Sequence, residues 1–351
     1  MNNGTFENPR DPMIEAFLPA SGWGDARTAP LAGDASNRRY LRIASDRGDA
    51  VLMDAPPDRG EDVRPFVAMT EWLLDCGFSA PQIFSKDVAD GFLLIEDLGD
   101  ALFARHLEVA PQDETQLYTA AVELLASLAQ QPVPRSIGSD QLALQPYDMD
   151  VLEREADLLT EWWLPAASTT APLPRVIREY AELIRESFAP VADARDVVVL
   201  RDYHAENLLW LPDRQGDAKV GLLDYQDALA GHAAYDLVSL LEDARRDTSR
   251  ELQEAMLDHY LQLRPEFDPQ RFRRDYALLG AQRNLKIIGI FARLWLRDSK
   301  DGYLDLIPRV WGHLMHDLSH PALGGLRDWV MRNVPAPDAG TLDRVRAGVN
   351  A

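Results

Sequence analysis

Three polar residues in the middle of the chain have the types and the spacing that a phosphoryl-transfer site requires. Asp202 is followed five residues later by Asn207, and a second aspartate, Asp224, comes after a further short apolar segment. A carboxylate can accept or orient the proton of an attacking hydroxyl, while an amide oxygen and a second carboxylate are ligands that suit Mg²⁺. Asp202 is therefore the candidate catalytic residue, and Asn207 and Asp224 are the candidate metal ligands.

Short apolar runs rich in β-branched residues separate these three residues and predict the strands that position them. The runs cover residues 197–200, 207–211 and 219–223, with a polar turn between the first two. Each has the length and composition of a buried strand, so the three polar residues are expected near strand ends. An acidic loop between core strands is the alternative, and for any one aspartate in so acidic a chain it is the better interpretation. The combination of three residues favours catalysis.

The segment from Leu200 to Asn207 resembles the catalytic loop H-x-D-x-x-x-x-N of the aminoglycoside phosphotransferase superfamily. Residues 223–225 are similar to its magnesium-binding motif I-D-[FWY], and residues 231–237 to its element G-x-x-x-[YF]-D-[LIV]. Within that element, Asp236 is expected to be a buried acid that braces the catalytic loop. The resemblance implies a phosphotransferase that uses ATP and Mg²⁺.

The resemblance also implies an α+β fold class, a bilobal protein-kinase-like structure with a small, mostly antiparallel β N-lobe and a larger helical C-lobe. The residue pattern agrees, because residues up to about 100 predict strands and one helix at 61–76, and the rest of the chain is mostly helical. We expect a nucleotide-binding lobe over residues 1–100 and a catalytic and substrate-binding lobe over residues 101–351. Further helices are predicted at residues 113–130, 147–163 and 175–188.

Two upstream segments resemble the nucleotide-contacting parts of the superfamily. Residues 91–99 form an apolar strand that runs into a polar turn, similar to the hinge whose main chain hydrogen-bonds the adenine edge, which implies contacts from Glu96 and Leu98. A plain hairpin strand is the alternative for this segment alone. Small and turn-forming residues at 31–43 lie where the superfamily places its phosphate-covering loop. Its expected phosphate contacts are Ser36, Asn37 and Arg38.

The sequence departs from the superfamily pattern at two positions. Position 200 is Leu where His is usual, so an apolar contact must replace that histidine. The strand at residues 50–57 lacks the lysine that kinases of this fold use to hold the α- and β-phosphates, and the first lysine of the chain is Lys86. Either the protein is a pseudokinase, or another cation replaces the lysine. Because the three catalytic-loop and metal residues are intact, we favour activity, with the replacement among Arg38, Arg39 and Arg42.

These departures, together with segments at 33–40, 53–66, 200–207 and 282–291, are similar to bacterial N-acetylmuramate/N-acetylglucosamine anomeric kinases over about residues 14–335. The resemblance implies phosphorylation of the anomeric hydroxyl of either sugar to the sugar 1-phosphate in cell-wall recycling. A hemiacetal hydroxyl is more acidic than an ordinary alcohol, so orientation by a carboxylate and charge neutralisation would suffice. A kinase for another hydroxyl, such as that of an aminoglycoside, and a nucleotide-binding pseudokinase are the alternatives.

Four residues are predicted to contact the sugar. Tyr203, His204 and Glu206 lie inside the catalytic loop, beside the reacting hydroxyl, although His204 is equally well explained as a packed loop histidine. Arg283 lies in a polar cluster, residues 282–284, at the expected start of an apolar helix at 285–296. A guanidinium group there would suit the lactyl carboxylate of N-acetylmuramate. The alternative is that these residues cap the helix.

Composition limits the partners and the location. The formal charge of −21 over 351 residues, without clustered cations, argues against nucleic acid. The single cysteine, Cys76, excludes an internal disulfide framework and fits a reducing cytosol. No basic and apolar leader and no uninterrupted span of membrane length is present, so we expect a cytoplasmic protein with a small-molecule amino-sugar substrate. The sequence does not define an oligomeric state.

Overall fold

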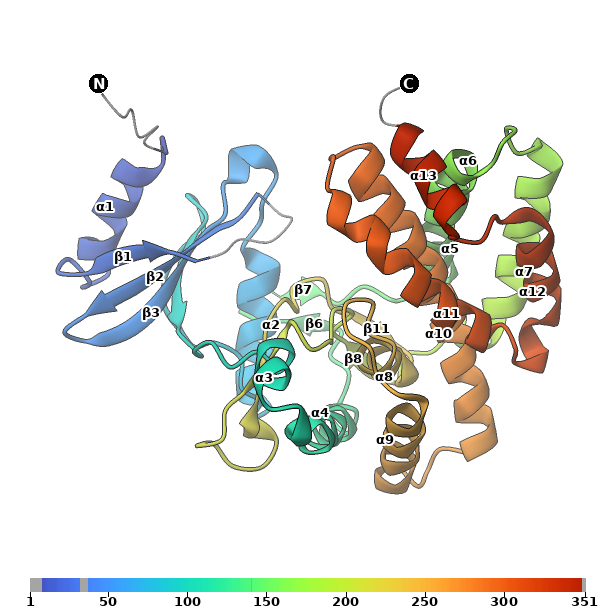
Figure 1. The fold of residues 1–351 in the computed structure, drawn as a ribbon. Helices are drawn as coiled ribbons and strands as arrows, with labels where there is room; N and C mark the ends of the chain where they lie inside the picture. The colour runs from blue at the N-terminus through green and yellow to red at the C-terminus, as the bar shows by residue number, and fades with distance from the viewer. Residues whose placement is uncertain (1–7, 32–36, 140, 349–351) are drawn as a thin grey trace. The chain divides into compact units, whose positions relative to one another are not determined.

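The computed structural model describes residues 8–31, 37–139 and 141–348, which fold into two compact units (Figure 1). The first unit comprises Met1–Ala101, Ser136–Ala143 and Leu209–Asp227, and the second comprises Leu102–Arg135, Leu144–Leu208 and Ala228–Ala351. The first unit therefore extends beyond its N-terminal segment, because two later segments also belong to it. The motif that contains Asp224 is therefore part of the first unit.

A five-stranded antiparallel sheet forms the framework of the first unit. Its order is β1 (Arg27–Pro30), β2 (Arg39–Ser45), β3 (Gly48–Asp54), β5 (Phe92–Glu96), β4 (Ile83–Asp87). Apolar residues alternate along β2 and β3, which places Leu41, Ile43 and Leu52 on one face of the sheet. Helix α1 (Asp11–Ala20) covers that face with Ile14 and Leu18, and together these residues form one core cluster.

Helix α2 (Arg64–Asp75) follows β3 and ties the later segments to the first unit. Its length matches the helix predicted at residues 61–76 to within three residues at each end. The ring of Phe66 stacks on that of Tyr225 with centroids 5.2 Å apart, and the hydroxyls of Thr70 and Tyr225 lie 2.6 Å apart. Strands β9 (Leu208–Trp210) and β10 (Val220–Leu222) pair with each other, and β6 (Ser136–Ile137) pairs with β7 (Leu142–Ala143).

The second unit is helical. Helix α10 (Pro269–Leu296) is its longest helix and contacts α5 (Met149–Ala156), α7 (Pro174–Ala192), α8 (Ala234–Leu241), α11 (Ile307–Asp317) and α13 (Ala339–Ala347). Gly289 allows the closest approach, because a Cβ atom there would lie 2.3 Å from the Leu158 backbone. The other helices of the unit are α3 (Phe103–Val109), α4 (Glu114–Leu128), α6 (Leu164–Ala167), α9 (Arg250–Leu263) and α12 (Gly324–Asn333). A short pair, β8 (Val197–Val199) with β11 (Leu229–Gly231), completes it.

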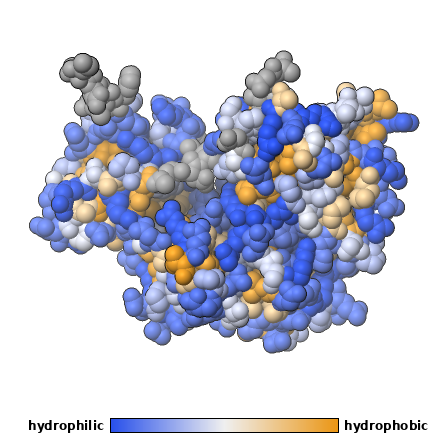
Figure 2. Space-filling view, viewed as in Figure 1, coloured by the Kyte–Doolittle hydropathy of each residue, from blue (hydrophilic) through white to orange (hydrophobic). Residues whose placement is uncertain are grey.

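The α+β class is confirmed, with an antiparallel first unit and a helical second unit. The predicted helices correspond to α4, α5 and α7, but one boundary was wrong. Residues 282–284 lie in the middle of α10, because that helix begins at Pro269 with Asp268 as its N-cap. Residues 282–284 therefore face neighbouring helices and do not cap a helix start. Hydrophilic residues dominate the visible face of each unit (Figure 2). Among the described residues, no helix combines the length and the apolar character needed to cross a bilayer.

Candidate active site

The loop that contains Asp202 connects β8 to β9. A side chain in the first turn of α8, Asp236, holds the start of this loop through hydrogen bonds. Both carboxylate oxygens of Asp236 accept backbone hydrogen bonds, from the amide of Leu200 at 2.6 Å and from that of Arg201 at 2.9 Å. Arg201 has φ +73°, a left-handed conformation that costs a non-glycine residue about 1 kcal/mol. The buried carboxylate compensates for that strain, which confirms Asp236 as a brace. Leu200, 3% exposed, packs where histidine was expected.

Asn207 closes the same loop from its other end. Its amide nitrogen Nδ2 donates to the carbonyl oxygen of Asp202 at 3.0 Å, and its backbone amide donates to the carbonyl of His204 at 2.8 Å. The donor end of the Asn207 side chain is thus engaged inside the loop. The acceptor end, Oδ1, is the part of the group whose chemistry suits a hard cation.

Asp224 follows β10 in the first unit and also has left-handed backbone geometry, with φ +57°. The next residue, Tyr225, is fully buried against α2, so the turn is anchored directly beside the carboxylate. Oδ1 of Asp224 accepts a hydrogen bond from Nε2 of Gln226 at 2.7 Å. The Asp224 carboxylate in the first unit and the Asn207 amide oxygen in the second are each a type of ligand that suits Mg²⁺.

A buried ionic network beside the loop was missed by the sequence analysis. Glu155 of α5 forms ion pairs with Arg201 and with Lys286 of α10, whose Nζ lies 2.9 Å from its Oε1. The hydroxyl of Tyr147 also donates to Glu155. Burial alone would raise the pKa of Glu155, but Lys286 and Arg201 outweigh it and lower that pKa to about 2. The network therefore fixes the residue next to Asp202 from a second side. The sequence gives little signal for it, because Glu155 and Lys286 lie among other charged residues of α5 and α10.

Two predicted sugar contacts disagree with the structure. The Tyr203 side chain is 1% exposed, and its hydroxyl donates to the carbonyl of Ala121 at 2.8 Å, so it is part of the core. Arg283 is 5% exposed, and its Nη1 donates to the carbonyl of Glu242 at 3.2 Å. Both predictions are corrected because the side chains are committed to buried backbone carbonyls. His204 is also buried, and burial lowers the pKa of its ring, as expected for a packed loop histidine.

Glu206 is the predicted sugar contact that the structure leaves accessible. Its Oε2 lies 2.9 Å from Nε of Arg245, and both residues line a cavity of about 300 Å³ in the second unit. The cavity is polar, and its other lining residues are Ala104, Glu108, Arg246, Asp247 and Arg309. Arg245 was not predicted, although it follows the brace helix by only a few residues.

The predicted nucleotide contacts stay predictions, and the structure gives the protein neighbours of several of these residues. Ser36 lies outside the described residues. The amide Nδ2 of Asn37 donates to the carbonyl of Arg59 at 3.2 Å, and Nε of Arg38 lies 2.8 Å from Oε2 of Glu61. The backbone amide of Glu96 donates to the carbonyl of Gln82 at 2.8 Å. Contacts of Glu96 and Leu98 with adenine stay a prediction.

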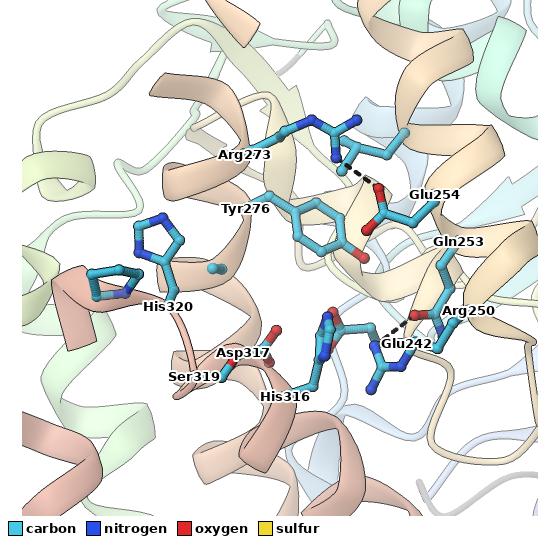
Figure 3. Close-up of a pocket in the computed structure, with 13 residues that line it drawn as sticks. Glu242, Arg250, Gln253, Glu254, Arg273, Tyr276, His316, Asp317, Ser319 and His320 are labelled. Atoms are coloured by element: carbon cyan, nitrogen blue, oxygen red, sulfur yellow. Dashed lines mark hydrogen bonds and ion pairs between the residues drawn. The ribbon is translucent and has the colours of Figure 1, made fainter. Parts of the chain in front are cut away.

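A second cavity of about 330 Å³ lies between α9, α10 and α11, and no predicted site residue lines it (Figure 3). Nδ2 of Asn284 lies 2.8 Å from Oε2 of Glu242 and 3.0 Å from Oδ2 of Asp317. Burial raises the pKa values of both acids, and their mutual interaction raises that of Asp317 further. Each of these two carboxyl groups is therefore harder to ionise than an ordinary one. Arg250 and Tyr276 lie beside this pair in the cavity wall.

The fold and the loop geometry define a kinase-like phosphotransferase. A family model described as the phosphotransferase enzyme family matches residues 27–273, and the chain belongs to that family. The ethanolamine kinase of Plasmodium vivax superimposes with a TM-score of 0.62 at 11% identity, covering 92% of this chain and 93% of its own. The ADP-bound aminoglycoside phosphotransferase APH(2'')-Ib gives a TM-score of 0.57 at 15% identity, covering 87% of this chain and 96% of its own.

Relatives with higher identity share one name. The chain is 40% identical to the N-acetylmuramate/N-acetylglucosamine kinase of Caulobacter vibrioides, over 94% of this chain and 98% of the relative. It is 33% identical to the protein of the same name from Pseudomonas aeruginosa, over 87% and 88% of the two chains. The prediction that the chain is a kinase of this superfamily is confirmed.

Proposed function

We propose that the protein phosphorylates the anomeric hydroxyl of N-acetylmuramate and N-acetylglucosamine, using ATP and Mg²⁺, in the recycling of cell-wall sugar. The observation that carries the proposal is an intact catalytic loop, braced by Asp236, in a chain similar along nearly its whole length to kinases named for these two sugars. The cytoplasm is the location that fits this activity, because ATP is available there.

Each loop residue has a role in the proposed reaction. Asp202 accepts the proton of the anomeric hydroxyl while the oxygen–phosphorus bond forms, and the bond from the γ-phosphorus to the β,γ-bridging oxygen of ATP breaks, releasing ADP. Asn207 and Asp224 would hold Mg²⁺, which would neutralise the charge of the phosphate oxygens. Among the remaining predicted contacts, Ser36, Asn37 and Arg38 approach the phosphates, and Glu96 and Leu98 approach adenine through main-chain groups.

The cavity beside Glu206 supports a sugar-sized acceptor next to the loop. Glu206 offers a carboxylate to sugar hydroxyls, and the guanidinium of Arg245 offers donors to an acyl or lactyl oxygen. These two residues take the place of Tyr203 and Arg283 in the proposal.

The test is an ADP-release assay with N-acetylmuramate, with N-acetylglucosamine, with kanamycin, and without acceptor. We expect release with the two sugars, loss of the reducing end of the sugar, and at least a 1,000-fold lower kcat for Asp202→Asn, in the range seen when an activating group is removed. Release with kanamycin alone would favour an aminoglycoside kinase. Nucleotide binding without release would favour a pseudokinase. A phosphorylated sugar that keeps its reducing end would refute the anomeric position.

A further inference from the structure

The segment that resembles the hinge is held by arginines from two different parts of the first unit. This hinge segment, residues 96–100, begins at the last residue of β5. Arg42 reaches its later part from β2, whereas Arg214 reaches its first residue, Glu96, from the connection between β9 and β10. All these segments belong to the first unit. Because β10 leads into the turn that carries Asp224, Arg214 is the one of the two that connects the hinge segment to a candidate metal ligand.

Arg214 bridges two side chains with separate nitrogens of its guanidinium. Nη2 lies 2.6 Å from Oε1 of Glu96, and Nη1 donates to Oγ of Ser79 at 2.7 Å. Both partners are held by other groups as well. The amide of Gln82 donates to Oε2 of Glu96 at 3.2 Å, and the Ser79 hydroxyl donates to the carbonyl of Ala218 at 2.7 Å. A planar guanidinium bonded to two groups at once fixes their separation.

Ser79 is also the residue to which β10 is attached. Its carbonyl accepts the backbone amide of Leu222 at 2.8 Å, and it forms a parallel bridge with Gly221. Asp224 follows Leu222 by two residues. The contacts that start at the hinge segment therefore reach the turn whose carboxylate is the candidate magnesium ligand.

Two further contacts join the hinge segment and its next residue to the β9–β10 pair. A Cβ atom at Gly221 would lie 3.2 Å from Cδ1 of Leu98, so the Leu98 side chain packs against β10. The backbone amide of Trp210 on β9 donates to the carbonyl of Ala101 at 2.8 Å. An apolar contact, a backbone hydrogen bond and a charged bridge thus attach this part of the chain to the strands that precede Asp224.

Arg42 provides an anchor of a different kind. Its guanidinium lies 2.6 Å from Asp97 and 2.9 Å from Asp100. Strand β2 belongs to the five-stranded sheet, whereas β9 and β10 form a separate pair. Arg42 therefore ties the hinge segment to the main sheet and not to the turn that carries Asp224.

We infer that Arg214 is a positioning residue that holds the adenine-contacting hinge segment and the Mg²⁺-binding turn of Asp224 at a fixed separation. A nucleotide whose base binds the hinge and whose phosphates bind Mg²⁺ must span both. When both are fixed in advance, binding does not have to order them, and less affinity is lost. The inference rests on the proposed function and adds a residue that couples nucleotide binding to Mg²⁺ binding.

The kinetic experiment compares Arg214→Met with Arg42→Met, and with Lys86→Met as a control. Lys86 and Glu71 form an ion pair in which the side chains are 42% and 35% exposed, so its loss should change each constant less than 2-fold. Arg214→Met should raise KM for ATP about 5- to 20-fold and the Mg²⁺ concentration for half-maximal rate about 5-fold, with kcat at saturation within about 3-fold. Arg42→Met should raise KM for ATP and leave the Mg²⁺ constant within about 2-fold.

Hydrogen exchange of the ligand-free protein tests the link without nucleotide, Mg²⁺ or turnover. Arg214→Met should speed exchange about 10-fold in residues 96–101 and also in residues 220–226, because one bridge holds both segments. Arg42→Met should speed exchange in the first segment only. Unchanged exchange in residues 220–226 of folded Arg214→Met would overturn the inference.

A double variant identifies the partner through which Arg214 acts. Glu96→Gln should show part of the rise in KM, and Arg214→Met/Glu96→Gln should be no worse than Arg214→Met alone. Additive losses would overturn the bridge between these two residues.

The same variants separate failure of this inference from failure of the proposed function. If Arg214→Met matches Lys86→Met in both constants and in exchange while the wild type phosphorylates the sugars, the inference is wrong and the proposed function stands. If the wild type shows no turnover, the ratio of the Kd values for AMP-PNP without and with Mg²⁺ replaces the kinetic constants. We expect that ratio to be smaller in Arg214→Met than in Arg42→Met, and equal ratios would overturn the inference.

Discussion

Replacing Asp236 with asparagine tests whether the catalytic loop is held by a carboxylate that is costly to bury. Burial raises the pKa of Asp236 to about 7, against the two backbone amides that lower it. Keeping the group ionised at neutral pH then costs about 4 kcal/mol relative to an ordinary aspartate. The neutral amide removes that cost. It also leaves one of the two amides, that of Leu200 or Arg201, facing an NH₂ group without an acceptor, which costs about 1–3 kcal/mol.

These opposing effects partly cancel, so the free energy of unfolding of Asp236→Asn should stay within about 3 kcal/mol of the wild type at pH 7.5. Catalytic activity, in contrast, should fall. Once one anchor is lost, Arg201 can leave its left-handed conformation, and Asp202, the next residue, moves with it. We expect kcat to fall about 100-fold or more, since small displacements of a reacting group have effects of this size. KM for ATP should change little.

The measurement combines urea unfolding with steady-state kinetics on the same preparations. Asp317→Asn is the matched control, because it makes the same change at a buried acid that has no contact with the catalytic loop. The amide of the variant can still hydrogen-bond Glu242, so kcat should be unchanged. A wild-type kcat in folded Asp236→Asn would refute the brace. A loss of stability above about 5 kcal/mol with normal kcat would make Asp236 a purely structural acid.

Three further predictions follow from the buried charges and the cavity. Glu155→Gln should lower the free energy of unfolding by about 3–5 kcal/mol, because Lys286 and Arg201 stay buried without their anion. The pKa of Glu155 is about 2 in the folded protein and about 4 in the unfolded chain, so its ionised form stabilises the protein above pH 4. This stabilisation is lost as the pH falls from 4 to 2. The stabilities of the wild type and the variant should therefore converge in that range. For Glu242 and Asp317, whose pKa values burial raises, the sign is opposite: wild-type stability should decline as pH rises above the ordinary carboxyl pKa of about 4, and Asp317→Asn should flatten that decline in urea titrations at pH 5 to 8. Arg245→Met should raise KM about 10-fold for N-acetylmuramate and less for N-acetylglucosamine, with an equal rise for both sugars counting against a carboxylate contact.

The sequence by itself determined the properties that depend on residue type and on short-range periodicity. Asp202, Asn207 and Asp224 carry their chemistry in a fixed spacing, and the apolar runs around them specify strands because side chains alternate every two residues. The absence of a strand lysine was equally visible. The helical character of the second unit followed from apolar spacing over long segments. The start of α10 did not, because the N-cap Asp268 precedes the apolar part of the helix by many residues.

Only the tertiary structure decided which side chains meet. Arg38, Arg39 and Arg42 look equivalent in sequence, and the sheet sends Arg39 to α1 and Arg42 to the hinge acids. Tyr203 and Arg283 have the chemistry of ligand contacts, but packing commits them to buried carbonyl groups. Partners such as Glu61 with Arg38, 23 residues apart, and Asp236 with Leu200, 36 residues apart, are set by the register of strands and the packing of helices. No local pattern encodes these distances, since they arise from burying many apolar side chains at once.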